Sequence, residues 1–423
     1  PRPICILTFP KAPNKKVNVS IGLMLSEEMK NVIPVLVAVF TIWASVANAQ
    51  SFFLSLGTDP STGVDRGSAS VVRKVDTRTG FLTFSSVGAE ELGPYIASAT
   101  LAWPDLAVDG DQLDLVFVTA GPADDGTREL TAYGASYRYV LPQTGVTIYV
   151  NADHGTYSLG SPQSLALDIN GDQTNTALGA RKVWLLPDAV RLTGTLEFAT
   201  RDSTGEVLGT QITDERLRML RAALRYESGS PFSLQQRYAV SMTKGFDGFG
   251  ASAAMNPMAS AAGVTTDFTK LAFSAEASMP LSASFLINAG VVGQWTNDSL
   301  PVSQRCGYGT NSYARGFDQS YVNGDRCLGA RVEVAYNVTR PKVTPTDIDL
   351  RQAFFGLDGG GIEDMENDIL PGNLDHWSSV SLGFRMAKGN FVGEIAVTHI
   401  VDKPVGAFAQ DDSRIWFQAA YQF

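Results

Sequence analysis

The stretch YIASATLAW, from Tyr95 to Trp103, shows the pattern that decides the fold. Polar Ser98 and Thr100 lie between apolar residues that recur at every second position: Tyr95, Ala97, Ala99, Leu101 and Trp103. Because successive side chains of a β-strand point to opposite faces, a period of two predicts a strand with one apolar and one more polar face. We therefore expect this stretch to be a strand of which one face is buried.

The same alternation recurs along the chain. Apolar residues occupy every second position in four later segments: Leu113, Leu115 and Phe117; Tyr133, Ala135, Tyr137, Tyr139 and Leu141; Leu192, Gly194, Leu196 and Phe198; and Val380, Leu382, Phe384 and Met386. Counting from about Phe81, we expect sixteen strands, centred at about residues 84, 100, 116, 135, 149, 178, 196, 221, 237, 272, 288, 333, 353, 382, 396 and 417. An even number lets an antiparallel sheet close with both of its ends on one side.

One segment, Thr213–Tyr226, is ambiguous. Its Leu217, Leu220 and Leu224 have helical spacing, and the residues before them fit a helix cap. A strand is the preferred interpretation, because the neighbouring segments all have the period of a strand.

Three features favour lipid, rather than a second sheet, as the environment of the apolar faces. Aromatic residues lie at the ends of these faces, as Tyr133 and Tyr139 do, like the aromatic girdles of membrane barrels. Short turns such as 142–145 alternate with long polar loops such as 245–265, as periplasmic turns and extracellular loops do. The chain ends in an apolar face made by Ile415, Phe417, Ala419, Tyr421 and Phe423. Tyr421 and the terminal Phe423 resemble the signal that the outer-membrane assembly machinery reads.

The fold class expected is therefore all-β: a transmembrane antiparallel barrel of about sixteen strands over residues 80–423. An apolar share of 44% and a mean hydropathy of +0.00 fit such a barrel, since they are too apolar for disorder and too polar for a bundle of membrane helices. A net charge of −10, without a cluster of Lys and Arg in the sequence, argues against nucleic acid as a partner.

The N-terminal region predicts export. Met29 and Lys30 precede an apolar run from Val32 to Val46, and Ala47-Asn48-Ala49 fits a cleavage site for a secretory signal peptide over 29–49. A membrane anchor is the less favoured alternative, because the run is shorter than the roughly 20 residues that a spanning helix needs. Residues 1–28 stay unassigned, and 50–79 form a short periplasmic segment before the barrel.

The cysteines fit an oxidising compartment. With Cys5 in the upstream segment, Cys306 and Cys327 are the only pair in the expected mature chain. We expect a disulfide that closes a loop of about 20 residues, worth roughly 3 kcal/mol in the chain-entropy model. Two free thiols are the alternative. No metal site, no cofactor site and no catalytic nucleophile setting is recognised, and His154, His376 and His399 stand alone.

The most specific stretch is 307–333. It contains Ala314-Arg315-Gly316-Phe317, then Gly324-Asp325-Arg326, then Arg331-Val332-Glu333. This resembles the sixth extracellular loop of the two-partner secretion transporters (the TpsB family, exporters of haemolysins and filamentous haemagglutinins). The resemblance covers about residues 80–423. The larger superfamily includes the barrel-assembly proteins of the outer membrane.

The resemblance implies a loop folded into the lumen, with the motif residues Arg315, Gly316, Phe317, Gly324 and Asp325. A guanidinium held there needs a carboxylate, preferably as a bidentate pair, and the candidates on the wall are Glu333 and Asp358. In the family the tip Arg meets the acidic residue of a Phe-x-Asp-x-Gly strand. Here Asp358 and Gly360 supply Asp-x-Gly, but the preceding Phe355 stands one place too early.

The function implied by the resemblance is secretion of a partner polypeptide, a haemolysin or adhesin, across the outer membrane of a Gram-negative bacterium. Expected partners are that polypeptide, outer-membrane lipid and the assembly machinery. Family members carry periplasmic POTRA domains, and residues 50–79 are too few to form one. The alternatives are an insertase for other outer-membrane proteins and a passive porin-like channel, and an enzyme is the least favoured class.

Overall fold

The computed structural model describes residues 78–423 apart from gaps at 122–128, 161, 189, 230–233, 254–255, 262, 310–312, 320, 340–341, 344–347, 366–374 and 405–410. The expected signal peptide over 29–49 and the upstream segment 1–28 lie outside the described residues, as does nearly all of the expected periplasmic segment 50–79. Within the described residues, no helix is both long and apolar enough to cross a bilayer.

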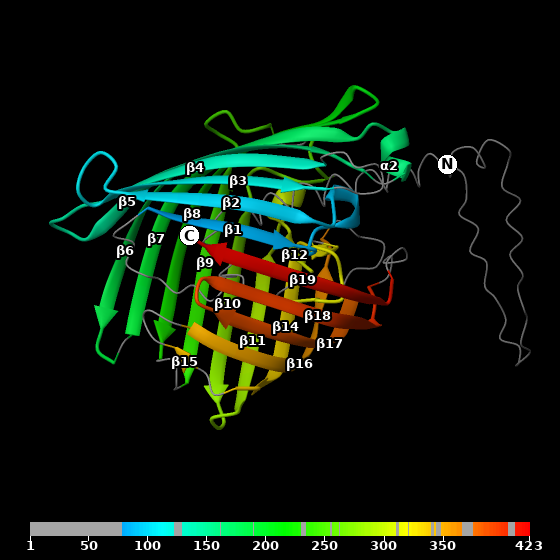
Figure 1. Ribbon diagram of the computed structural model, residues 1–423. Helices are drawn as coiled ribbons and strands as arrows, with labels where there is room; N and C mark the ends of the chain where they lie inside the picture. Colours follow the sequence, from blue (N-terminus) through cyan, green and yellow to red (C-terminus); the bar gives the residue numbers. More distant parts are fainter. Residues whose placement is uncertain are drawn as a thin grey trace, which may run out of the picture. The chain divides into compact units, whose positions relative to one another are not determined.

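The described chain forms one closed antiparallel sheet (Figure 1). Its long strands are β1 (Thr79–Ser85), β2 (Ile96–Pro104), β3 (Asp111–Ala120), β4 (Leu130–Val140), β5 (Val146–Ser158), β6 (Asn170–Leu186), β7 (Val190–Val207), β8 (Thr210–Ser228), β9 (Gln235–Phe246), β10 (Thr269–Pro280), β11 (Phe285–Thr296), β14 (Arg326–Asn337), β16 (Ile348–Glu363), β17 (Asp375–Lys388), β18 (Phe391–Asp402) and β19 (Ser413–Gln422). A two-residue strand, β15 (Lys342–Val343), pairs with β16. Strand β1 pairs with both β2 and β19, which closes the sheet.

Leaving out the short β15, the 17-stranded sheet has the sixteen strands that the sequence predicts, and each expected centre falls within one of them. The prediction of an all-β closed barrel is therefore confirmed. The ambiguous segment lies in β8. There Leu217 is buried inside, whereas Leu220 and Leu224 are exposed outside, so alternation separates leucines that helical spacing would have grouped on one face.

The apolar faces of the strands point outward. Large apolar side chains are exposed around the whole barrel: Leu115, Tyr133, Val150, Leu178, Leu196, Val240, Phe273, Val291, Val332, Leu357, Leu382, Ile395 and Ile415. The inner face is polar. Ser136 Oγ donates to Asn151 Oδ1 at 2.6 Å, and Arg138 lies 3.5 Å from Asp114. This is the reverse of a soluble domain and fits a barrel whose outside meets lipid.

The two ends of the barrel differ. One end carries short connections such as 141–145, 187–189 and 281–284, together with the start of β1 and the C-terminus (Figure 1). The other end carries long connections, among them 247–268 and 297–325. Most connections follow the predicted alternation of short turns and long loops. The exceptions are the two-residue turn between β7 and β8 at the long-loop end and the longer connection between β14 and β16 at the short-turn end. In a barrel of the outer membrane these ends correspond to the periplasmic and the extracellular side.

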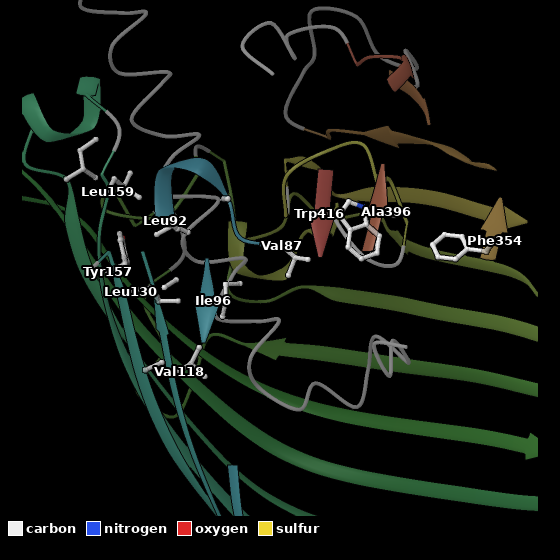
Figure 2. Packing of buried hydrophobic residues seen from close by; sticks show 14 of the residues in the cluster. Val87, Leu92, Ile96, Val118, Leu130, Tyr157, Leu159, Phe354, Ala396 and Trp416 are labelled. Carbon is white, nitrogen blue, oxygen red and sulfur yellow. The ribbon is translucent and has the colours of Figure 1, made fainter. Parts of the chain in front are cut away.

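Two of the long connections fold inward at the extracellular end. One contains the 3-10 helix η1 (Glu90–Leu92) and the other the short helix α2 (Pro162–Ala166). Leu92 and Leu159 are buried in one apolar cluster with Leu130, which lies at the start of β4 (Figure 2). The backbone N–H of Gly160 donates to the Glu91 carbonyl oxygen at 2.9 Å, which joins the two loops. Apolar packing therefore fixes these loops inside the rim.

Candidate functional site in the barrel lumen

The connection 297–325, here called the lumen loop, leads from β11 to β14 and folds into the barrel. It contains the 3-10 helix η2 (Val302–Gln304) and a small two-stranded sheet of β12 (Cys306–Tyr308) and β13 (Val322–Gly324). A disulfide joins Cys306 to Cys327, the second residue of β14. The tip of the lumen loop therefore lies within a covalently closed segment.

The tip is a tight turn at Ala314–Phe317. The Phe317 N–H donates to the Ala314 carbonyl oxygen at 2.9 Å, and Ala314 has φ +57°, a left-handed conformation that residues other than glycine rarely adopt. Gly316 stands where an added Cβ would lie 2.7 Å from Ile400 Cγ1 of β18. A glycine at this position lets the turn approach the wall closely.

The guanidinium of Arg315 points to the wall, and the residue is 5% exposed. Its Nη1 donates to Glu333 Oε2 of β14 at 3.0 Å and to Ser381 Oγ of β17 at 3.3 Å. Glu333 is itself 3% exposed, so the ion pair is screened from bulk water. Of the two candidate carboxylates, Glu333 is the one that the guanidinium contacts by a hydrogen bond.

The bidentate partner of Glu333 is a different arginine. Arg385 of β17 donates from Nη1 to Glu333 Oε1 at 2.8 Å and from Nη2 to Oε2 at 2.9 Å, whereas Arg315 uses one nitrogen only. Asn288 of β11 adds a bond of 3.0 Å to Oε1. Glu333 therefore joins the lumen loop to three strands of the wall, and the expected bidentate pair of Arg315 is replaced by a single charge-assisted bond.

Asp358 of β16 holds the backbone of the tip. Its Oδ2 accepts the Arg315 N–H at 2.9 Å and the Ser379 hydroxyl at 2.9 Å, and Ser379 Oγ accepts the Gly316 N–H at 3.2 Å. The family resemblance implies that the guanidinium meets this acidic residue. Instead, Glu333 takes the guanidinium and Asp358 takes the peptide N–H.

The register of β16 explains the displaced phenylalanine. Asp358, Gly356 and Phe354 share the inward face, whereas Phe355 is exposed on the outside. Gly356 occupies the position of the family's Phe, and a Cβ there would lie 2.9 Å from Arg315 Nη1. The ring that reaches the site is Phe354, whose centroid is 5.4 Å from Arg315 Cζ. Alternation turns the Phe355 side chain outward, so this residue takes no part in the site.

Phe317 anchors the tip in an apolar pocket. It is fully buried, edge-on to Trp377 of β17 at 6.4 Å between ring centroids and stacked on Tyr321 at 6.3 Å. Arg414 of β19 donates to the Phe317 carbonyl oxygen at 2.9 Å. A Cβ on Gly360 would lie 2.7 Å from the Trp377 ring, so this glycine makes room for the ring that Phe317 meets.

Gly324 and Asp325 lie at the root of the lumen loop, away from Arg315. Asp325 Oδ1 accepts the Leu300 N–H at 2.9 Å, Oδ2 accepts the Met365 N–H at 2.9 Å, and the carboxylate lies 3.4 Å from Arg305 Nε. Burial raises the pKa of this loop carboxyl to about 6, although the charge of Arg305 opposes that shift. Asp325 therefore fixes where the loop begins and ends, whereas Arg315 fixes its tip.

The last residue of the chain closes the barrel. The Phe423 N–H donates to the Gly80 carbonyl oxygen at 2.9 Å, and the Gly80 N–H donates to the Phe423 carbonyl oxygen at 2.9 Å. An added Cβ on Gly80 would overlap the Phe423 ring. Tyr421 is paired with Leu82 and is exposed outside. Of the expected assembly signal, Tyr421 thus belongs to β19 and Phe423 follows directly after this strand.

A family model described as haemolysin secretion/activation protein ShlB/FhaC/HecB matches residues 71–386. The chain belongs to this family. The family is one of secretion proteins and not of enzymes. Together with the barrel, membership of the ShlB/FhaC/HecB family indicates an outer-membrane protein of a Gram-negative bacterium. A search of the curated proteins found no match.

Solved structures share the fold. CdiB from Escherichia coli has a TM-score of 0.67 at 16% identity, over 82% of this chain and 63% of that chain. CdiB from Acinetobacter baumannii has a TM-score of 0.62 at 13% identity, over 82% and 60%. BamA from Haemophilus ducreyi lacking POTRA domains 1-3 has a TM-score of 0.55 at 12% identity, over 82% and 70%. This member of the ShlB/FhaC/HecB family thus spans about three fifths of each CdiB chain.

Sequence reasoning missed three residues of the site in this family member: Arg385, Phe354 and Arg305. A signal exists for the first two, because Arg385 lies on the polar face of an alternating strand and Phe354 is an even number of residues from Asp358. No local signal exists for Arg305, since its partners Asp325 and Asp364 are joined to it only by the fold of the loop.

Proposed function

We propose that this barrel secretes a partner polypeptide through its lumen and that the lumen loop is the resident element that must yield to it. The observation that carries the proposal is the docking of Arg315, which crosses from the loop to Glu333 on the wall. Membership of the ShlB/FhaC/HecB family supports the secretion step.

The contacts of the tip suit a displaceable element. Ala314 and Phe317 pack in one apolar cluster, and the rest of the tip is held by polar bonds: Arg315 to Glu333, Arg315 N–H to Asp358, and Gly316 N–H to Ser379. Such bonds exchange with water at modest net cost, about 1–3 kcal/mol each when one partner is charged. A polypeptide entering a wet lumen can replace them one at a time, which a continuous apolar core would not allow.

The partners follow from the same proposal. The secreted polypeptide occupies the lumen, lipid covers the exposed apolar belt, and the outer-membrane assembly machinery inserts the barrel with the help of Tyr421 and Phe423. The chain itself carries out no catalytic step and uses no cofactor. The haemolysin or adhesin class of cargo rests on the family name alone.

Replacement of Arg315 tests the role of the tip. In Arg315→Ala the barrel should still fold, because the bidentate Arg385–Glu333 pair remains, but secretion of a co-expressed polypeptide encoded beside this gene should fall about tenfold or more. Arg315→Lys should keep part of the activity, since it retains charge without the planar fork. The measurement is the amount of polypeptide in the medium at equal barrel abundance.

Arg218→Ala is a matched control, because Arg218 pairs with Asp202 and bonds to Phe249 on the outer side of β8 and leaves the lumen unchanged. Secretion by Arg315→Ala equal to that of Arg218→Ala would remove the assigned role.

Insertion of other outer-membrane proteins is the second candidate, and the likeness to BamA at a TM-score of 0.55 favours it over a passive porin. The two functions differ in their product. An insertase leaves its client folded in the membrane, whereas a secretion protein releases it to the medium. Fractionation of cells that express this chain with a candidate client separates the two, and steady solute conductance unaffected by Arg315→Ala would instead favour the porin.

A further inference from the structure

The lumen wall opposite the docked tip carries arginines near the periplasmic end. Alternation along β4, β6, β7, β8 and β9 turns them all inward, although they are far apart in the sequence. We call this set the arginine face: Arg138, Arg181, Arg191, Arg225 and Arg237. Three carboxylates on β3, β8 and β10 point the same way, namely Asp114, Glu227 and Glu276.

The carboxylates are already engaged. Asp114 lies 3.5 Å from Arg138, and Glu227 is shared between Arg191 at 3.8 Å and Arg237 at 3.2 Å. Glu276 lies 3.4 Å from Arg237 and 2.9 Å from Arg331. The next carboxylate deeper in the lumen is Glu197, which accepts the Tyr149 hydroxyl at 2.9 Å and pairs with Arg221 at 3.3 Å. Positive charge therefore exceeds negative charge on this wall, in a chain whose net charge is −10.

The positive charge of Arg181 is not neutralised by a carboxylate among the described residues. Among the described residues it has no ion pair and no hydrogen bond to its buried Nε. Arg138 and Arg225 are close enough for their charges to oppose that of Arg181. Like charges gathered on a low-dielectric wall focus a positive potential, which attracts anions from the lumen.

The arginine face is open to the lumen. The side chains of Arg138, Arg191 and Arg237 are 35%, 47% and 32% exposed, whereas Glu333 beneath the docked tip is 3% exposed. The tip of the lumen loop docks on the wall from β14 to β19. The loop also accepts bonds from Arg201 of β7 and Lys270 of β10, but these residues lie towards the extracellular end and not at the arginine face. A ligand entering from the periplasmic end would thus meet the arginines without first displacing the loop.

We propose that the arginine face is a binding site for carboxylate side chains, and that its occupant is an acidic segment of the polypeptide as it enters the lumen. This occupant rests on the proposed secretion function. The spread of the guanidinium groups over several strands fits an extended chain with several carboxylates better than it fits a single small anion. Guanidinium groups match carboxylates in geometry as well as in charge.

A titration tests the site on the whole protein in detergent. A fluorescently labelled oligoglutamate is titrated with the wild type, Arg181→Gln, Arg181→Lys and Arg218→Gln, and its anisotropy is recorded. Arg181→Gln breaks no ion pair in the described structure, and Arg218→Gln removes the same charge from the outer side as a control. We expect Arg181→Gln to weaken binding about fivefold, as the loss of one solvated charge contact implies. Arg181→Lys should keep part of the affinity, because it retains the charge without the planar fork, and Arg218→Gln should bind as the wild type does.

Three results would overturn the proposal: equal affinities of the wild type and Arg181→Gln, equal weakening by Arg218→Gln, or competition by free glutamate at the same concentration of carboxylate. The last result would mean a site for small anions. Because the titration needs no secretion, its failure removes the arginine face alone, whereas intact binding without secretion would remove the proposed function. Retention of the folded form on unheated gels shows that each variant has folded.

Discussion

At the scale of single residues, Glu333 is the hub of the lumen site. It accepts bonds from Arg315, Arg385 and Asn288, and it is almost fully buried. A buried ion pair adds little net stability compared with apolar packing, but removal of one partner costs about 3–5 kcal/mol because the other charge stays buried. The bonds of Glu333 therefore define one docked position of the lumen loop on the wall, more than they add to the stability of the barrel.

Replacement of Gly360 tests whether the Trp377 ring needs the space that this glycine leaves. A Cβ there would lie 2.1 Å from the Leu328 carbonyl oxygen and 2.7 Å from the Trp377 ring, so backbone must move. We expect Gly360→Ala to destabilise the barrel by about 2 kcal/mol or more and to loosen the pocket of Phe317. The measurement is the urea midpoint of the folded form on unheated gels.

The neighbouring Gly359 supplies the control. A Cβ there lies no closer than 3.2 Å to any atom, and its side chain would point outward. Gly359→Ala should change stability by less than about 1 kcal/mol, the usual effect of replacing a strand glycine. Equal midpoints for the two variants would show that Trp377 does not need the space at Gly360.

At the scale of elements, the lumen loop has two attachments of different chemistry. The root is closed by the disulfide between Cys306 and Cys327 and by Asp325, whereas the tip is held by Arg315 and Phe317. A cross-link restricts the open states of a loop more than a hydrogen bond does. Displacement of the loop should therefore begin at the tip, with the root still in place.

The stability of the protein should depend on pH through Asp325 at the root of the lumen loop. Burial raises the pKa of Asp325 to about 6 in the folded protein, above the ordinary 3.8. The folded state then binds the proton more tightly than the unfolded state, so stability increases as the pH falls from above 6 towards 4 and changes no further below that. We expect the contribution of Asp325 to raise the thermal unfolding midpoint at pH 5 relative to pH 7.5, once the pH dependence shared with Asp325→Asn is subtracted.

Asp325→Asn provides the comparison, because it resembles the protonated acid at every pH. The difference in midpoint between this variant and the wild type should shrink as the pH falls from 7.5 to 5. A difference that stays constant over this range would mean that Asp325 does not titrate there.

At the scale of the whole molecule, closure depends on the seam between β1 and β19. Strand β1 spans only Thr79–Ser85, the shortest of the long strands, and its pairing with β19 runs from Ser85 with Gln418 to Phe81 with Gln422. The two bonds between Gly80 and Phe423 extend this seam at its periplasmic end. An open seam would leave backbone groups unpaired in lipid, at several kcal/mol for each group.

Deletion of Phe423 tests closure. The variant loses both bonds to Gly80 and should yield less folded barrel, with a lower urea midpoint by about 1–3 kcal/mol. Phe423→Tyr keeps the backbone bonds and should fold in vitro as the wild type does. If the terminal aromatic residue is also an assembly signal, the deletion will reduce insertion in cells more than refolding in detergent. Equal losses in both would leave only the structural role.

The local sequence pattern alone predicts the strands and the all-β architecture of this protein. The period of two predicts each strand and its apolar face, because alternation is a property of the extended backbone and needs no distant contact. The same property, applied to Asp358, would have found Phe354 in place of Phe355. The tip motif at Arg315 and the terminal Phe423 are likewise visible in the sequence.

Tertiary structure decided which of these groups meet. The choice of Glu333 for the guanidinium and of Asp358 for the peptide N–H depends on the path of the lumen loop, and the pairing of Arg305 with Asp325 depends on the fold of its root. The arginine face exists only because five separated strands turn one side chain each towards the same space. Strand register and barrel closure determine which side chains lie together. Both depend on pairing between strands, and the first and last strands are far apart in the sequence.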